Sequence, residues 1–278
     1  MSITFKKVNN QVVKAIPQYG GEQKIPVLGE ELFPEPYANI FLCAKKKSGK
    51  TSTIFHILKN CVGKNTKLYI FCSTVFKDKS YRTIIDYFTK KNIEVNFYTS
   101  LYEDGQDVLL NLIEELENNV EDEEDDEDEE DDDYSDLPPI VRAYRFPKKK
   151  KNKKKKKPKY IAPEYIFVFD DLSTELKSKT LVQLLKKNRH FLCKIIISSQ
   201  YYHDLDPQSR KQLDYFIIFK GQPEAKLELI HKDADTQLEF DEFIKIYNIA
   251  TSKPYSFLYI SSRDDTYRVG FNTLINID

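Results

Sequence analysis

Tryptophan is absent from the 278-residue chain, and methionine (1), cysteine (4) and glycine (8) are scarce. The cysteines form no C-x-x-C pair, and most lie in or beside apolar segments. This pattern favours a reduced, intracellular protein with thiols in its core over a disulfide framework or a metal cluster. The four cysteines are Cys43, Cys61, Cys72 and Cys193.

Long apolar segments are lacking as well. The first residues, "MSITFKKVNNQVVKAIPQYG", contain no apolar stretch of signal-peptide length. Nowhere does the chain reach the run of about 20 apolar residues that a membrane helix requires. We therefore expect a soluble protein that is not secreted and does not insert into a membrane.

Charge is segregated along the chain, although the net charge is only −1. Residues 121–133 are all acidic, and residues 148–159 are almost all lysine. A segment of this composition cannot bury apolar surface, so we predict a disordered insertion at about 119–160. The two blocks either pair loosely with each other or leave the lysines to bind nucleic acid. The remaining chain is mildly basic, too weakly to indicate a polyanionic partner by itself.

Short apolar runs that do not alternate with polar residues indicate strands buried on both faces, as in a parallel sheet covered by helices. Segments with helical spacing separate the runs, which predicts an α/β domain of three layers with a mostly parallel central sheet. The runs occupy residues 40–44, 68–72, 165–169, 195–198 and 215–219, and the helical segments begin near Ile54 and cover about 81–90, 108–116 and 176–187.

The C-terminal part reads as an extension of the same domain. Two helical segments follow residue 220, and residues 255–262 and 266–271 are predicted to form a hairpin across "RDD". We therefore predict an N-terminal extension at 1–35 and one domain at 36–278, which the charged insertion interrupts.

A phosphate-binding loop is indicated by "AKKKSGKT", residues 44–51, between the first apolar run and the first helical segment. Gly49, Lys50 and Thr51 match the last three positions of a Walker A motif. Backbone N–H groups of such a loop bind phosphate at the start of the helix, the lysine reaches the β- and γ-phosphates, and the Thr51 hydroxyl ligates Mg²⁺. The expected nucleotide contacts are Ala44, Lys45, Lys46, Lys47, Ser48, Gly49, Lys50, Thr51 and Ser52.

The alternative is a chance Gly-Lys-Thr preceded by lysines that face the solvent. Ala44 stands where the motif has its first glycine, and alanine there costs about 1 kcal/mol or more if the position requires a positive φ. The strand before the loop and the amphipathic helix after it favour a phosphate loop with a modified first position.

Paired acids follow the third apolar run in "YIFVFDDL". This is the Walker B arrangement, in which Asp170 holds Mg²⁺ through water and Asp171 polarises the attacking water. A helix N-cap is the alternative role, and it is compatible with catalysis for one of the two residues.

Two further polar residues follow later strands. The run "KIIISSQ" ends in Gln200, whose amide is suited to sense the γ-phosphate and hold the attacking water. Arg210 precedes the last of the five apolar runs, where it is either an arginine finger for the nucleotide of a neighbouring subunit or a solvated side chain.

Together, "AKKKSGKT", "IFVFDD", "IIISSQ" and the arginine before "YFIIFK" resemble the FtsK–HerA superfamily. Within it, they resemble the poxvirus-type genome-packaging ATPases of large DNA viruses, virophages and Polinton-like elements. The resemblance covers roughly residues 35–220 and extends to the tail "FLYISSRDDTYRVGF".

The resemblance implies a RecA/ASCE-like P-loop NTPase with an additional strand, which assembles as a homo-oligomeric ring and drives double-stranded DNA into a capsid with ATP and Mg²⁺. It implies sequence-independent DNA contacts, partners at a capsid portal or vertex, and a location in a viral factory, the host cytoplasm or nucleus, or the virion vertex. By resemblance, the catalytic residues are Lys50, Asp171, Gln200 and Arg210, and the metal ligands are Thr51 and Asp170.

Two other functions stay open on the sequence alone. One is a P-loop kinase of nucleotides or small molecules, and the other is a nucleotide-regulated DNA-binding or scaffold protein with weak or no hydrolysis. A GTPase is disfavoured because the chain contains no N-K-x-D motif.

Overall fold

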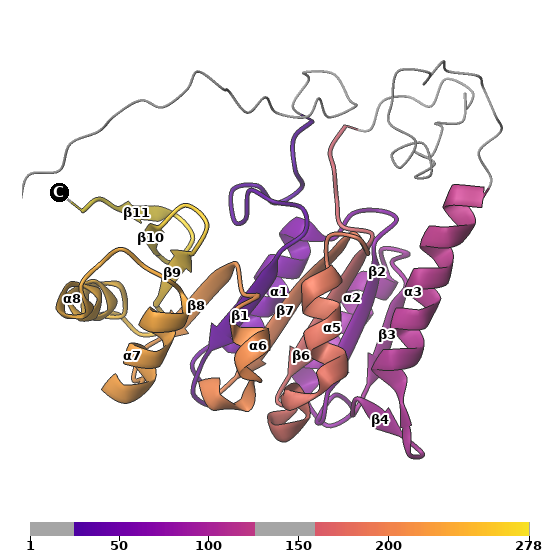
Figure 1. Cartoon of the computed structure of the whole chain (residues 1–278), viewed down its shortest axis with the longest axis horizontal. Coiled ribbons are helices and arrows are strands. Elements are labelled where there is room, and N and C mark those ends of the chain that lie inside the picture. The colour runs from indigo at the N-terminus through magenta and orange to yellow at the C-terminus, as the bar shows by residue number, and fades with distance from the viewer. Residues whose placement is uncertain (1–24, 126–158, 278) are drawn as a thin grey trace, which may run out of the picture.

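The computed structural model describes residues 25–125 and 159–277 (Figure 1). Most of the predicted insertion and most of the predicted N-terminal extension lie outside these residues. No helix within the described ranges is long and apolar enough to cross a membrane.

A nine-stranded sheet forms the centre of the domain, in the order β11-β10-β9-β8-β1-β7-β6-β2-β3. The six strands from β8 to β3 are parallel, and the last three strands of the chain add antiparallel to the β8 edge. All five apolar runs are parallel strands, which confirms the predicted fold class. The strands are β1 (Asn39–Cys43), β2 (Lys67–Cys72), β3 (Val95–Tyr98), β6 (Tyr165–Asp170), β7 (Cys193–Ser199), β8 (Tyr215–Phe219), β9 (Phe257–Ser261), β10 (Thr266–Val269) and β11 (Thr273–Ile275).

Helices cover both faces of the sheet, so the domain has three layers (Figure 1). On one face lie α1 (Lys50–Cys61) and α2 (Lys79–Thr89). The other face carries α3 (Val108–Asp125), the 3-10 turns η1 (Ser173–Lys177) and η2 (Tyr202–Asp204), and the helices α5 (Lys179–Lys187), α6 (Pro207–Arg210), α7 (Glu224–Asp233) and α8 (Phe240–Ala250).

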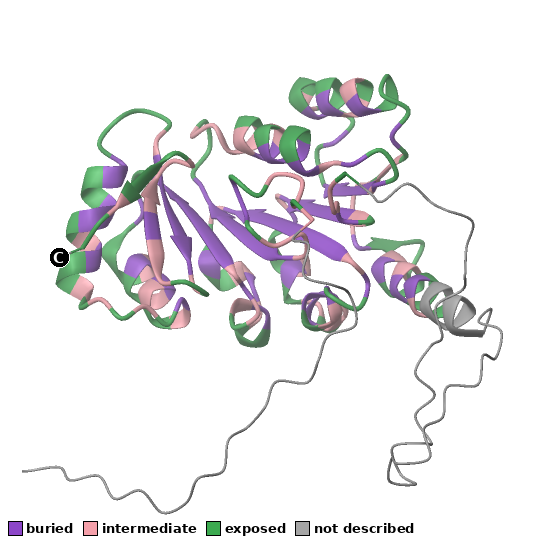
Figure 2. Cartoon of the chain, turned by 90° about the horizontal axis from the view of Figure 1, so that it is seen from above, coloured by how far each residue is buried: buried purple, intermediate pink, exposed green. Residues whose placement is uncertain are grey.

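Each face of the sheet has its own apolar core. Ile54 and Ile57 of α1 pack with Ile84 of α2 on one side, whereas Ile113 of α3 and Leu184 of α5 belong to the cluster on the other. Figure 2 shows the central strands buried along their length and the helices buried only on the sides that face them. Burial on both faces explains why these strands read as continuous apolar runs.

The strand order determines where the polar strand ends meet. Strand β7 lies between β1 and β6, with Ser199 beside Cys43 and Ser198 beside Asp170. The carboxyl ends of the parallel strands therefore come together at one edge, the lower edge in Figure 1. In a parallel α/β sheet, ligands bind at this edge.

Four short strands were missed by the sequence analysis. Strand β3 is only partly buried, and "VNFY" contains no apolar run. Strand β11 is an exposed edge strand, and β4 (Tyr102–Glu103) and β5 (Gln106–Asp107) form a small hairpin of polar residues. Strands at an edge bury little surface, so they leave little hydrophobic signal.

The two ends of the described chain pack onto the domain. Phe33 of the predicted N-terminal extension is fully buried, and its ring lies 5.0 Å from that of Tyr215 on β8. The C-terminal hairpin of β9 and β10 forms as predicted, and β9 pairs with β8 over its whole length.

Candidate active site at the carboxyl edge of the sheet

The loop between β1 and α1 has the backbone of a phosphate cradle. Gly49 is the N-cap of α1 in the left-handed conformation (φ 94°) and provides no side-chain cap, so the first N–H groups of the helix are left for another acceptor. Lys47 is also left-handed (φ 63°). Ala44, by contrast, is not among the described residues with a positive φ, which is why alanine can replace the first glycine of the motif.

The side chains of the three consecutive lysines in the loop face the solvent. Lys45, Lys46 and Lys47 are all exposed, whereas Ala44 is fully buried and donates its N–H to the carbonyl of Ser199 at 3.2 Å. The lysines raise the local positive potential, and the Ala44 hydrogen bond joins the loop to the end of β7.

An ion pair joins the two sequence motifs. Lys50 Nζ lies 2.8 Å from Asp170 Oδ1, with side chains that are 17% and 3% exposed. Lys50 is the first residue of α1 and Asp170 the last residue of β6, so the pair spans the position of β7. The lysine and the acid that the sequence assigned to phosphate and metal are therefore in direct contact.

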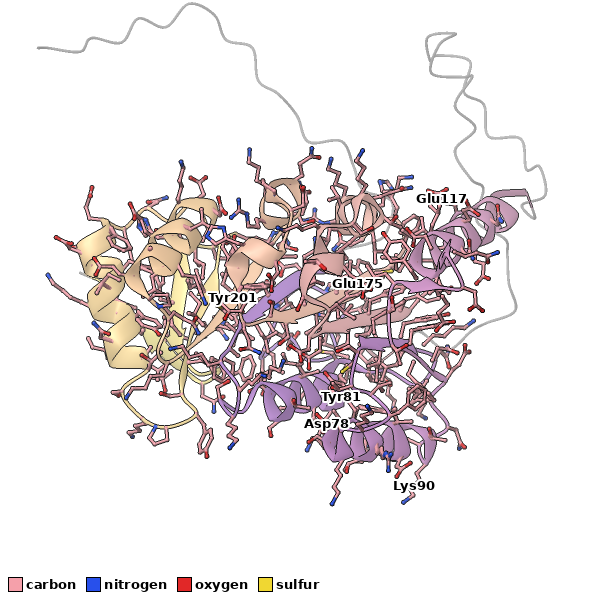
Figure 3. The ribbon with its side chains drawn as sticks, turned by 90° about the horizontal axis from the view of Figure 1, so that it is seen from below. Asp78, Tyr81, Lys90, Glu117, Glu175 and Tyr201 are labelled. Atoms are coloured by element: carbon pink, nitrogen blue, oxygen red, sulfur yellow. The ribbon has the colours of Figure 1, made fainter. Side chains whose placement is uncertain are left out.

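A second group holds the same carboxylate from α2. The Tyr81 hydroxyl donates to Asp170 Oδ2 at 2.7 Å, and Tyr81 is 1% exposed (Figure 3). Burial and the charge of Asp170 raise the pKa of Tyr81 well above its ordinary value, so the phenol stays protonated and keeps donating. No motif indicated Tyr81, which sits on the apolar face of a helix like a core residue.

Asp171 occupies a left-handed backbone position at the end of β6 (φ 58°), a conformation that aspartate tolerates better than most residues. Its N–H donates to the Ser198 carbonyl at 3.4 Å, and its own carbonyl accepts from Ser73 Oγ at 3.0 Å. The backbone is thus fixed from both neighbouring strands. Asp171 does not cap a helix here, since Ser178 caps α5 and the residue before η1 is Leu172.

Gln200 follows β7, where its position was predicted, and a lysine of α7 fixes its backbone. Lys226 Nζ donates to the Gln200 carbonyl at 2.6 Å and to Gln222 Oε1 at 2.8 Å. The Gln222 amide donates in turn to the Cys43 carbonyl at 3.4 Å. Gln222 and Lys226 therefore connect the end of β7 to the end of β1. No motif in the sequence indicated this role for either residue.

Arg210 is held within its own chain. Its Nε lies 3.3 Å from Asp233 Oδ2, both side chains are at most 15% exposed, and the guanidinium packs over the Tyr202 ring at 5.2 Å. Burial and the nearby Asp233 raise the pKa of Tyr202. A role of Arg210 in a neighbouring subunit would require this ion pair to open, so the finger stays a prediction.

Two buried hydroxyl groups at this edge have no hydrogen-bond partner: Ser48 Oγ in the loop and Ser198 Oγ on β7. Buried polar atoms are nearly always satisfied in folded proteins, so unpaired ones in a site point to a missing ligand or water. Within the described residues, no three His, Cys, Asp or Glu side chains gather as a metal cluster. The buried Asp170 carboxylate, in contact with the residue before Thr51, suits Mg²⁺, which binds through one or two carboxylates together with substrate phosphates.

These features define the class of protein. A phosphate loop after one strand, paired acids after a second, and a polar strand inserted between them make an additional-strand P-loop NTPase.

The comparisons with known proteins agree with this class. The sequence profile of the poxvirus A32 protein family matches residues 137–263. Among solved structures, the genome-packaging NTPase B204 of Sulfolobus turreted icosahedral virus 2 in complex with AMP aligns with a TM-score of 0.51 and 17% identity, over 88% of this chain and all of that one. The complex of the same NTPase with AMPPCP aligns with a TM-score of 0.51 and 18% identity, over 84% of this chain and 97% of that one. The DNA-packaging ATPase B204 from Sulfolobus turreted icosahedral virus aligns with a TM-score of 0.50 and 17% identity, over 84% of this chain and 96% of that one. No curated protein matches.

At 17–18% identity, the structural likeness establishes the shared fold. The poxvirus A32 profile covers residues 137–263 of the 278, which is less than half of the chain. Both matches agree with the resemblance of the motifs to viral genome-packaging ATPases.

Proposed function

We propose that this protein is a Mg²⁺-dependent ATPase that works as a homo-oligomeric ring, translocates double-stranded DNA and delivers it to a capsid portal or vertex. The observation that carries the proposal is the contact of Lys50 with Asp170 beside an uncapped helix start. Structures of B204 in complex with AMP and with AMPPCP share this fold, which supports nucleotide binding by this chain.

Lys50 provides the first step, which is an exchange of partners. Without nucleotide, its ammonium neutralises the buried Asp170 carboxylate. The triphosphate of ATP in the loop offers a larger negative charge, so Lys50 turns to the β- and γ-phosphates and frees one oxygen of Asp170. Tyr81 stays on the other oxygen and keeps the carboxylate in place.

The freed Asp170 and the Thr51 hydroxyl would hold Mg²⁺, which neutralises charge on the phosphates when it is bound. Asp171 takes the proton of the attacking water, and the Gln200 amide orients that water toward the γ-phosphate. Lys226 contributes by fixing the backbone from which Gln200 projects.

Steady-state ATP hydrolysis with and without long double-stranded DNA tests the proposal. We expect DNA to stimulate the wild type, and Lys50→Ala and Asp171→Asn to lower the rate by at least about 100-fold, because they remove a phosphate ligand and the general base. Lys64→Ala is the control, since Lys64 is an exposed lysine in the turn after α1, outside the loop, and the variant should retain the rate within about twofold.

Two outcomes would replace the proposal. Nucleotide binding without turnover, even with DNA present, would indicate a nucleotide-regulated scaffold. Transfer of the γ-phosphate to nucleoside monophosphates, indifferent to DNA, would indicate a kinase.

A further inference from the structure

We propose that Tyr255 is the platform on which the base of the bound nucleotide stacks. The inference rests on the proposed function, because it assigns the base-binding part of the same ATP site. It depends on an aromatic ring that no motif of the sequence indicated.

Tyr255 lies in the loop between α8 and β9 and touches the phosphate loop from the side of β8. A β-carbon placed on Gly49 would lie only 3.4 Å from Cδ1 of the Tyr255 ring. Tyr255 is nevertheless 71% exposed. The ring therefore lies close to the glycine that begins α1, and the residue remains largely exposed beside the place where phosphate would bind.

The loop that carries Tyr255 is fixed to the domain. The Thr251 hydroxyl donates to the Tyr247 carbonyl at 2.8 Å, Lys220 Nζ donates to the Ser252 carbonyl at 3.2 Å, and Ser256 Oγ donates to the Lys253 carbonyl at 2.7 Å. Strand β9 then pairs with β8 from its first residue. The ring is thus presented by an anchored turn.

Core packing does not account for this ring. Tyr255 adopts a left-handed backbone conformation (φ 61°), which is uncommon for a bulky residue, and its side chain buries little surface in return. Glycine or asparagine would fit the turn with less strain, so the tyrosine is better explained by a ligand than by the fold.

The other exposed aromatic rings of the described chain are less suited to this role. Phe76, Phe97 and Tyr102 belong to the segments around β2, β3 and β4, beyond β6 and Asp170. Tyr201, which is labelled in Figure 3, follows β7. The ammonium of Lys226 already lies over its ring, 5.2 Å from the centroid. On the β8 side of the loop, away from the metal acid, Tyr255 is the exposed ring that reaches the phosphate site.

Parallel binding measurements with ATP and inorganic tripolyphosphate test the platform, because only ATP carries a base. Alanine substitution of a stacking aromatic weakens base binding by about 5- to 150-fold. We expect Tyr255→Ala to weaken ATP binding in that range and to leave tripolyphosphate binding unchanged, while Tyr255→Phe retains both. Tyr102→Ala, at a ring that is 46% exposed on the β4–β5 hairpin, is the matched control and should change neither.

The absence of tryptophan provides a direct optical readout. Tyr255→Trp would be the sole tryptophan of the chain, and ATP should quench its emission whereas tripolyphosphate should not. Tyr102→Trp should report neither ligand.

The possible failures are distinguishable. Suppose that wild type binds both tripolyphosphate and ATP, and that Tyr255→Ala weakens the binding of both equally or of neither. The base then does not stack on Tyr255, and the proposed ATP site is unaffected. If Tyr255→Ala changes the oligomeric state and leaves the ATP affinity unchanged, the ring is a subunit contact, which also overturns the inference. If wild type binds neither ligand, the proposed function fails with it.

Discussion

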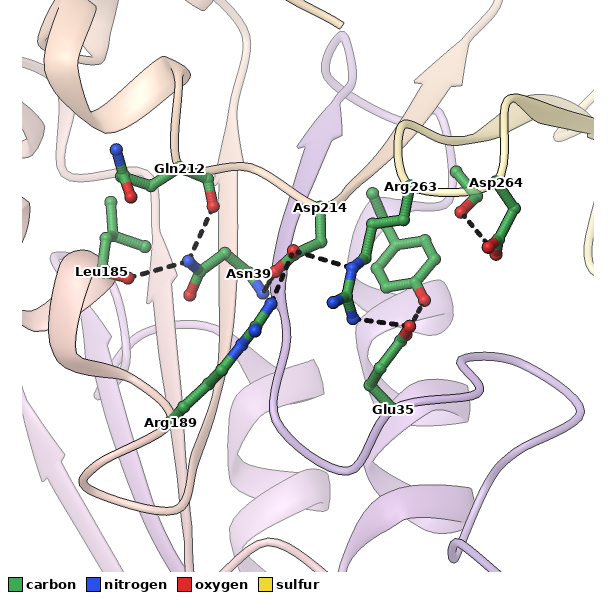
Figure 4. A network of polar contacts seen from close by, with 10 residues as sticks. Glu35, Asn39, Leu185, Arg189, Gln212, Asp214, Arg263 and Asp264 are labelled. Carbon is green, nitrogen blue, oxygen red and sulfur yellow. Dashed lines mark hydrogen bonds and ion pairs between the residues drawn. The ribbon is translucent and has the colours of Figure 1, made fainter. Parts of the chain in front are cut away.

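The central strands carry polar clusters at both ends, and the two clusters use their hydrogen-bonding groups differently. At the amino end (Figure 4), Asp214 accepts from the Asn39 backbone N–H at 2.8 Å, and the Asn39 amide donates to two backbone carbonyls at 3.0 and 2.7 Å. Arg263 pairs with Glu35 at 2.6 Å. Asn39 Oδ1 and the neighbouring Asn188 Nδ2 and Ser262 Oγ have no partner, and the other groups named here satisfy one another within the chain.

At the carboxyl end, the polar groups are only partly satisfied. Lys50, Asp170 and Tyr81 pair with one another, but the hydroxyls of Ser48 and Ser198 have no partner and the start of α1 has no side-chain cap. The uncapped start of α1 marks the carboxyl-end cluster as the one open to a ligand. Polar groups that bond to one another within the chain join loops and stabilise the fold, whereas donors and acceptors without a partner in a site are available to bind a ligand.

Breaking the amino-end cluster should give the largest effect on stability. Asp214→Ala removes a carboxylate that is 15% exposed, and it leaves the Asn39 N–H and the nearby Arg189 without this acceptor, whereas Arg263 keeps Glu35. We expect the free energy of unfolding to fall by about 2–4 kcal/mol, with ATP affinity per folded molecule unchanged. Urea unfolding and nucleotide titration measure the two quantities.

Asp86→Ala, at an exposed position of α2, is the control and should change stability by less than about 0.5 kcal/mol. Lys50→Ala should differ from Asp214→Ala in losing activity per folded molecule, and it should also lose stability because the buried Asp170 carboxylate loses its cation. Loss of ATP binding in Asp214→Ala that exceeds its unfolded fraction would contradict the division between the two ends.

A smaller change separates positioning from packing at the catalytic end. Tyr81→Phe keeps the ring and removes the hydrogen bond to Asp170, so we expect hydrolysis to fall by about 3- to 10-fold and the Mg²⁺ concentration for half-maximal rate to rise. A metal titration at saturating ATP measures both. Tyr87→Phe on the same helix is the control, and an unchanged Mg²⁺ requirement in Tyr81→Phe would reduce Tyr81 to a core residue.

The smallest expected effect concerns Lys194, which is fully buried beside the amino-end cluster. Its Nζ donates to the Glu35 carbonyl at 2.8 Å and lies over the Phe33 ring at 5.0 Å. Burial lowers the pKa of Lys194 below its ordinary 10.5. At neutral pH, Lys194→Met should change the free energy of unfolding by no more than about 1.5 kcal/mol, because a buried charge contributes little net stability.

The pH dependence of that difference has a defined sign. Between the lowered pKa and 10.5, the unfolded chain binds the proton more readily than the folded one, so raising the pH stabilises the wild type. Relative to Lys194→Met, the wild type should therefore become more stable as the pH rises through this window. Urea unfolding of both proteins at neutral and alkaline pH measures it. A difference that is constant with pH would mean that the folded state does not shift this amine.

Some site residues could be predicted from local sequence patterns alone. Lys50, Thr51, Asp170 and Asp171 could be assigned because their roles follow from positions beside strands, and strands buried on both faces leave an apolar run in the sequence. Gln200 could be placed beside the loop because parallel strands bring their carboxyl ends to one edge. The predicted roles in catalysis stay predictions until the variants are measured.

Tyr81, Lys226 and Tyr255 could not be found this way. Tyr81 meets Asp170 across 89 positions of sequence, and Lys226 reaches Gln200 from a separate helix. Arg210 was given two possible roles, and neither included the pair with Asp233 that the packing of α6 against α7 creates. Such contacts depend on where helices lie against one another, which the periodicity of one helix does not specify.

Local sequence patterns were enough to predict the P-loop fold class, because they encode which segments are buried and which polar residues end them. They predicted the phosphate loop, the paired acids and the sensor position for the same reason. Only the tertiary structure decided that Lys50 contacts Asp170, that Tyr81 holds the same carboxylate and that an exposed ring stands beside Gly49. Those contacts join segments distant in the chain, and their geometry exists only when the sheet and its two helical layers pack together.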